Sequence, residues 1–442
     1  MCVLHIMDHQ IVVIDNNQKL KVQANHIGQV NAVSTINQHH QEDKEQDQQK
    51  AYLRVMEHRL KFKTQRLQRS QGCPCIFKFI GDLGGDYLHP RIVSIGPYHR
   101  GNEYLVEFDD NKWYFLGELL LRMNAKSSKD LGFFLKEMRG LEARAQGCYV
   151  SYGDVGPLCS YDFVEMILLD GCFVIELLRF LGKSEDRIDD DPVFVRPSTV
   201  PLMIADLLKL ENQLPFYVLE SLYAVTRTSE HEKELLSLIM EAIRLVFPVP
   251  TKVPFSAHGP KHLLELVYKS LMPKVYTTHI DNMRQTKPTS NETIQCVARL
   301  RTSGIKFKAR KHVGFLDIEF KNGLLEIPVI NINDFNMNLI TNCLAWEQSS
   351  RDAFTYFTDY IYFMNRLINE PKDVALLRDD GIITRHSRDD ASVVSFFNNL
   401  GKNIQVYNIR RSYLSREMAE IESYFSSNWA TIMRTLSIHN SP

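Results

Sequence analysis

The segment LLKLENQLPFYVLESLY, residues 207–223, places a carboxylate and two amides between two apolar stretches and directly before a proline. Leu214 precedes Pro215, so helical geometry is disfavoured there, and Pro215 has no N–H to donate to the turn before it. We therefore expect one helix to end in this segment and a second to begin at Pro215. Such a break frees backbone groups in an apolar setting, where each unpaired group costs about 1–3 kcal/mol.

Three consecutive polar side chains in this segment, Glu211, Asn212 and Gln213, are suited to pair with those freed groups. Glu347 and Gln348 repeat the pattern after another apolar run, in LAWEQSS. We predict that these five residues form a structural polar plug. The alternative is a hydrolase in which Glu211 and Glu347 act as acid and base, which requires their carboxyl groups to lie within about 10 Å of each other. Nothing in the sequence brings them together, so the structural interpretation is favoured.

Apolar residues recur at helical spacing through most of the chain after residue 100. Helices are expected to begin near the following residues: Asp109, Asp130, Tyr161, Pro201, Pro215, Glu230 and Lys261. The apolar run FVEMILLDGCFVIELLRFLG, residues 163–182, carries too many charges for a membrane span and is interpreted as a buried helix pair. The segment HPRIVSIGPYHRGN predicts a short strand that ends at Gly96-Pro97.

One segment has the alternation of a β-hairpin. In FLDIEFKNGLLEIPVINI, apolar and charged residues alternate up to Phe320, and Asn322-Gly323 supplies the positive φ that a tight turn requires. The predicted fold class is therefore mainly α with a small antiparallel β element (α+β), in a single large helical domain. A chain of 442 residues with 44% hydrophobic content is sufficient for such a core.

The N-terminal region differs in composition from the rest of the chain. Residues 1–47 are rich in Gln, Asn and His and poor in large apolar side chains, so we expect a disordered tail. Residues 48–72 place Leu53, Met56, Leu60 and Leu67 on one helical stripe with basic residues elsewhere. We interpret this stripe as a docking helix; a helix on a membrane surface is the alternative.

Charge and cysteine usage restrict the partners and the location. Lys+Arg 52 against Asp+Glu 53 gives a net charge of -1, so no overall field attracts nucleic acid. A basic cluster from Lys306 to His312 is interpreted as a solvated face. Scattered cysteines indicate reduced thiols, and the N-terminus lacks the features of a signal peptide. We expect a protein that is not secreted and is located in the cytoplasm, including the peripheral surface of the plasma membrane.

No catalytic, cofactor-binding or metal-binding residue is predicted. Cys73-Pro-Cys75 supplies at most two of the roughly four ligands that a closed zinc site needs. GDLGGD, residues 81–86, lacks the Lys-Ser/Thr of a phosphate loop. Ser94 and His99 flank Gly96-Pro97, but there is no nucleophile elbow.

Several motifs, taken in order, resemble one family of plant proteins, described as domain of unknown function 247. The matching stretches are RIVSIGPYHRGN, NKWYFL, FVEMILLDGCFVIELLR, DLLKLENQLPFYVLESLY, HLLELV, GIKFK, FLDIEFKNGLLEIPVI, AWEQ, YIYFMNRLI and DVALLRDDGII. The resemblance covers residues 73–442. This chain departs from the family pattern at Thr341-Asn342 and Trp346, and its end, YFSSNWATIMRTLSIHNSP, lacks the membrane span that members usually carry.

The resemblance implies specific protein recognition, because members encoded at grass self-incompatibility loci act as pollen-side determinants. The family supplies no established catalytic residues. We therefore expect a non-enzymatic recognition protein with protein partners, no nucleic acid, no small-molecule substrate and at most peripheral membrane contact. The alternatives are the Glu211/Glu347 hydrolase and a membrane-associated scaffold without recognition specificity. A hydrolase would gather Asp170, Glu211 and Glu347 in one pocket, whereas recognition would use the loops Thr226–Glu232, Val249–Pro260 and Thr277–Thr293.

Overall fold

The computed structural model divides the chain into two compact units, residues 1–68 and 69–442. It describes residues 50, 52–54, 56–57, 75–79, 81, 83, 86–127, 129–149, 160–182, 199–229, 232–247, 259–273, 294–311, 313–350, 353–385, 389–404 and 412–439. In the first unit, the described residues 50, 52–54 and 56–57 are helical. The predicted disordered tail, residues 1–47, and most of the predicted docking helix lie outside the described residues.

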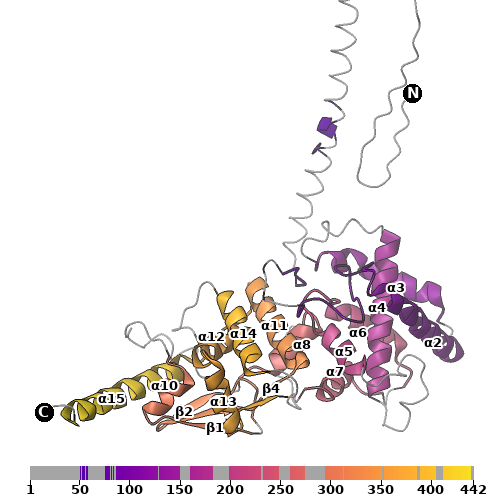
Figure 1. Ribbon diagram of the computed structural model, residues 1–442. Coiled ribbons are helices and arrows are strands. Elements are labelled where there is room, and N and C mark those ends of the chain that lie inside the picture. Colours follow the sequence, from indigo (N-terminus) through magenta and orange to yellow (C-terminus); the bar gives the residue numbers. More distant parts are fainter. Residues whose placement is uncertain are drawn as a thin grey trace, which may run out of the picture. The chain divides into compact units, whose positions relative to one another are not determined.

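The N-terminal part of the second unit is a group of helices (Figure 1). These are η1 (Val106–Phe108), α2 (Asp109–Ser127), α3 (Leu131–Gln146), α4 (Ser160–Leu181), α5 (Thr199–Leu207), α6 (Phe216–Thr226), α7 (Leu235–Arg244) and α8 (Leu263–Ser270). Helices α2, α3, α6 and α7 all pack against α4. Fifteen of its residues, from Phe163 to Leu178, are buried, so α4 is the central helix of this part.

The predicted helix pair within residues 163–182 is wrong, because α4 is one continuous helix of 22 residues. Gly171, at its middle, does not interrupt it. A Cβ atom at this position would lie 2.3 Å from Cδ1 of Leu222 on α6. The glycine therefore allows close approach of α6 to α4, and packing compensates for its low helix propensity.

The C-terminal part combines helices with short strands (Figure 1). In chain order it contains α10 (Val297–Thr302), β1 (Lys306–Arg310), β2 (Glu319–Lys321), β3 (Leu324–Pro328), β4 (Ile330–Ile332), α11 (Asp334–Ser349), α12 (Tyr356–Leu367), α13 (Pro371–Asp379), β5 (Ile383–Arg385), α14 (Asp390–Lys402) and α15 (Ser415–His439). The mainly α fold with a small β element is thus confirmed.

The predicted β-hairpin is also confirmed, since β2 pairs antiparallel with β3 and the turn residues Asn322 and Gly323 have φ of 52° and 74°. The structure adds parallel pairings that the sequence did not indicate. β1 pairs with the other edge of β3, which gives the order β1-β3-β2, and β4 pairs with β5. Helix α15 packs on β2, with Tyr424 edge-on to Phe320.

The basic cluster around β1 is partly paired within this sheet. Lys308 lies 2.7 Å from Glu326 on β3, and Arg310 lies 2.9 Å from Glu319 on β2. Lys308 remains largely exposed, as expected for a solvated face. His312 lies outside the described residues. Throughout the part of the chain that the structure describes, no helix has the length and apolarity needed to cross a membrane.

Most helix starts agree with the sequence, but two local predictions are wrong. Helix α7 begins at Leu235 rather than near Glu230. Residues 91–95 are not a strand, because their backbone N–H groups bind side chains rather than a neighbouring strand.

Candidate functional site

The break between α5 and α6 lies where Pro215 predicts it. α5 ends at Leu207 and α6 begins at Phe216, and residues 208–215 form a buried irregular connection. Gln213 bridges this connection. Its Nε2 donates to the carbonyl oxygens of Leu207 and Lys209, both at 2.7 Å, and its Oε1 accepts the N–H of Leu264 at the start of α8. The amide therefore joins the end of α5 to α8.

The neighbouring side chains Asp206 and Asn212 hold a different segment, residues 91–95. Asp206 accepts hydrogen bonds from the three backbone N–H groups of residues 91–93, at 2.7 to 3.1 Å. Asn212 accepts from the N–H of Ile95 at 2.6 Å and donates to the carbonyl oxygen of Val93. Burial raises the pKa of Asp206, although the three backbone donors oppose this shift. The end of α5 and the connection to α6 thus supply hydrogen-bonding partners to the backbone of residues 91–95.

A buried lysine in the same connection faces α11. Lys209 Nζ donates to the carbonyl oxygen of Tyr87 at 2.9 Å and to Oδ1 of Asn338 at 2.8 Å. Asn342, one turn further along α11, accepts the N–H of Leu210 and donates to the same Tyr87 carbonyl. Burial lowers the pKa of Lys209 to about 8, with the negative charge of Asp206 acting against it. Helix α11 therefore also supports the connection, through Asn338 and Asn342.

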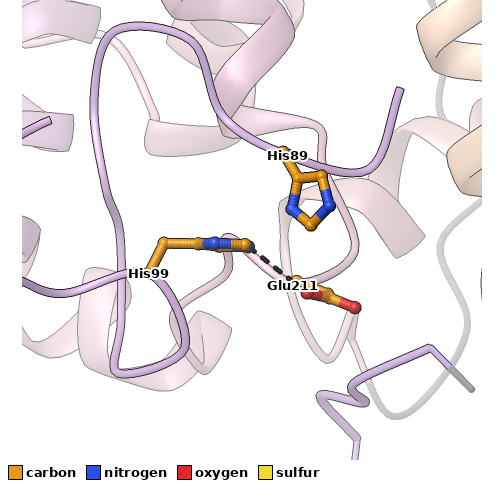
Figure 2. Close-up of side chains that lie close together, drawn as sticks. All are labelled: His89, His99 and Glu211. Atoms are coloured by element: carbon orange, nitrogen blue, oxygen red, sulfur yellow. Dashed lines mark ion pairs between the residues drawn. The ribbon is translucent and has the colours of Figure 1, made fainter. Parts of the chain in front are cut away.

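Glu211 lies in a separate cluster with two histidines, His89 and His99, from the loop that precedes η1 (Figure 2). Its Oε1 accepts the N–H of Phe79 at 2.9 Å, and its Oε2 lies 3.3 Å from Nε2 of His99. Burial raises the pKa of Glu211, but His99, the N–H of Phe79 and the electrostatic effect of His89 together outweigh it, so the pKa is lowered overall. His89 stands edge-on to His99, with ring centroids 5.5 Å apart. The potential ligand atoms of all three side chains lie within 4.8 Å of one another.

Glu347 has its own set of partners at the start of α12. Its oxygens accept the backbone N–H groups of Phe357 and Thr358, the hydroxyl of Thr358 and the hydroxyl of Tyr268, at 2.6 to 2.8 Å. The N-cap residue of α12 makes no side-chain hydrogen bond to the first N–H groups of that helix. The carboxylate of Glu347, on α11, accepts these N–H groups instead. Burial raises the pKa of Glu347 to about 8, against the effect of its four donors.

The structure does not bring the five residues of the predicted plug into one cluster. Asn212 and Gln213 pair with the groups that the helix break frees, and Glu347 pairs with a helix start elsewhere. Gln348 is exposed and donates to the carbonyl oxygen of Asn403 at 3.3 Å. Among the described contacts, Glu211 and Glu347 share no partner.

The sequence alone assigns no role to several polar residues of this region. These are Asp206, Lys209, Lys112, Asn338, His99 and the exposed His89, and the sequence places Asp170 only in the catalytic pocket of the hydrolase alternative. The available signal was a charged or amide side chain inside an otherwise apolar helical run, since such groups are almost never buried without partners.

Together, fold and site define a class: a mainly α-helical domain in which buried carboxylate, amide and ammonium groups hold the segments between helices. The chain belongs to the plant family DUF247, described as plant protein of unknown function, whose model matches residues 78–441.

Two relatives from Arabidopsis thaliana accompany this match. "UPF0481 protein At3g47200" is 28% identical over 397 residues, which cover 82% of this chain and 80% of the relative. "Putative UPF0481 protein At3g02645" is 19% identical over 442 residues, which cover 78% and 80%. No solved structure matches this chain. The family resemblance inferred from the motifs is thereby confirmed.

Proposed function

We propose that this chain is a non-enzymatic recognition protein that binds a protein partner through the exposed face of η1 and α2. The supporting observation is a group of large apolar side chains turned outward there. Val106 is 47% exposed, Trp113 49% and Leu121 70%, and Tyr114 lies beside them. Trp113 and Leu121 are separated by two helical turns, so they lie on the same side of α2. Exposed aromatic and aliphatic side chains of this kind characterise protein interfaces.

The buried carboxylates favour recognition over hydrolysis. Glu211, Glu347 and Asp170 each accept hydrogen bonds from backbone N–H groups, which a structural role explains. A hydrolase would need an acid and a base on opposite sides of one substrate bond. The Glu211/Glu347 hydrolase and the membrane-associated scaffold remain the alternatives that the test must separate.

The finer proposal is a pollen-side self-incompatibility determinant of the grass type, cytoplasmic or peripheral at the plasma membrane. Three loops are predicted to carry specificity. The described part of the first, Thr226–Glu232, is held to α4 by an ion pair in which Glu232 lies 2.6 Å from Arg179. Most of Val249–Pro260 and all of Thr277–Thr293 lie outside the described residues. Exchange of these two loops between alleles should transfer partner preference; preference that follows the exchange of residues 163–179 contradicts this proposal.

The test uses the full chain with a Trp113→Ser/Leu121→Ser variant. A Leu131→Ser/Leu135→Ser variant is the matched control, because these two leucines are 40% and 38% exposed on α3. Partners cross-linked in plant tissue are identified, purified and titrated against each variant. We expect the α2 variant to bind at least about 30-fold more weakly, as removal of interface anchors typically does, and the α3 variant to bind normally.

Two results would overturn the proposal. One is equal binding of the purified partner by the α2 variant and the wild type. The other is hydrolysis of an ester or glycan substrate that is lost in Glu211→Gln or Glu347→Gln, which would establish the enzyme alternative.

A further inference from the structure

We propose that His89, His99 and Glu211 form a binding site for a divalent transition-metal ion of the Zn²⁺ type. The three side chains come from two segments that are distant in sequence, and their ligand atoms lie within 4.8 Å of one another (Figure 2). Two imidazole nitrogens and one carboxylate oxygen are a donor set that zinc and related ions prefer. Neither the helix break nor the recognition face requires this arrangement.

The spacing of the two buried ligands already fits an ion. Nε2 of His99 and Oε2 of Glu211 are 3.3 Å apart, and their side chains are 9% and 5% exposed. Two ligands of a tetrahedral zinc, each at about 2.0–2.1 Å, are separated by about 3.3–3.5 Å. His89 is exposed, so a small rotation of its side chain can shorten the remaining separations.

His99 Nε2 is buried and has no hydrogen-bond partner, although Glu211 Oε2 is nearby. In a simple ion pair, an N–H group at Nε2 would point at the carboxylate oxygen and donate to it. Here the two atoms are 3.3 Å apart, which is long for such a hydrogen bond but is the ordinary separation of two ligand atoms around one ion. A cation between them would satisfy a nitrogen that is otherwise costly to bury.

The surrounding hydrogen bonds fix the ligands before any ion binds. Oε1 of Glu211 accepts the N–H of Phe79, which leaves Oε2 as the coordinating atom. The loop that carries both histidines is held by Asp206, Asn212 and Asp170, through the N–H groups of residues 91–93, 95 and 96. Two of these three anchors lie within five residues of Glu211. A site on a backbone held in this way is preorganised, and three protein ligands leave a position for water or an incoming donor.

The experiment measures zinc binding to the untagged full chain after removal of metal by chelator dialysis. Competition with a chromophoric chelator gives the Kd for ZnCl2, and the visible absorption of a Co²⁺-loaded sample reports the coordination geometry. The variants are His89→Ala, which changes an exposed side chain, His99→Ala, and the double variant that combines both changes. A His39→Gln/His40→Gln variant is the control, because it removes two histidines of the N-terminal region instead.

We expect one tight zinc site in the wild type and in the control, at least about tenfold weaker binding in each cluster variant, and a Co²⁺ spectrum that disappears with them. Wild-type affinity no higher than that of the His89→Ala/His99→Ala double variant would overturn the proposal. Loss of binding in the His39/His40 control but not in the cluster variants would overturn it too.

Discussion

The side-chain ammonium of Lys112 lies 2.8 Å from Oδ1 of Asp170, and both side chains are buried, at 2% and 1% exposure. Lys112 also donates to the carbonyl oxygen of Ser94, and Oδ2 of Asp170 accepts the N–H of Gly96. This pair therefore joins α2 to α4 and attaches the loop that carries His89 and His99 to both. Burial lowers the pKa of Lys112, but Asp170 and Asp109 outweigh it and raise the pKa overall.

Replacing Lys112 by Met should destabilise the protein by about 3–5 kcal/mol, because it leaves the carboxylate of Asp170 buried without its counter-charge. The measurement is the free energy of unfolding in denaturant. Lys126→Met, at an exposed position of α2, is the control and should change little. The double variant Lys112→Met/Asp170→Asn should recover part of the loss, because it removes the isolated charge and keeps an oxygen for Gly96. A free energy of unfolding for Lys112→Met equal to that of the wild type would disprove this role.

Replacing Gln213 by Ala should cost about 1–3 kcal/mol, since it unpairs buried carbonyl groups at the end of α5 and the N–H of Leu264. Gln348→Ala is the matched control: it removes the same side chain from an exposed position and should stay within about 0.5 kcal/mol of the wild type. Thermal unfolding of both variants checks this. Equal melting temperatures would show that the amide is not needed at the break.

Features set by short-range chemistry could be predicted from the sequence. Pro215 ends one helix and starts the next whatever surrounds it, and Asn322-Gly323 adopts the positive φ of a hairpin turn in most contexts. The apolar spacing that predicts α2 and α3 is likewise local. These features were sufficient for the fold class.

The remaining features depend on contacts between distant segments. Residues 91–95 have the β-branched character of a strand, but Asp206 and Asn212 take their N–H groups, so no strand forms. Gly171 by itself suggests a break in α4, but Leu222 of α6 packs against it and the helix is continuous. The cluster of His89, His99 and Glu211 exists only because the connection between α5 and α6 lies against the loop. None of these relationships has a signal within one window of sequence.

Replacing Gly96 by Ala should destabilise the protein more than replacing Gly101 by Ala. Both glycines have positive φ, 74° and 79°, so both variants carry the backbone strain of a side chain in that conformation. Only at Gly96 would the new Cβ lie 2.8 Å from the carbonyl oxygen of Gln213; at Gly101 nothing lies within 4 Å. The difference between the two melting temperatures isolates the cost of the contact. Equal losses would mean that the loop and the α5–α6 connection separate easily.

The stability of the protein should fall with rising pH because of Glu347. Its pKa in the folded state is about 8, above its ordinary value of 4.5, so the folded chain binds a proton that the unfolded chain has already lost between these values. Stability from this group is therefore complete below about pH 4.5 and is lost as pH rises through about 8. Glu347→Gln has no proton to lose at this position, so it serves as the reference.

The free energies of unfolding of the wild type and Glu347→Gln should therefore be compared at several pH values. The wild-type value minus the variant value should decrease by about 2–3 kcal/mol from about pH 5.5 to about pH 7.5, since one pKa unit corresponds to about 1.4 kcal/mol. Subtraction removes the contribution of every other group that titrates equally in both proteins. A difference that is flat across this range would mean that Glu347 is ionised in the folded protein, with its charge stabilised by Tyr268, Phe357 and Thr358 despite burial.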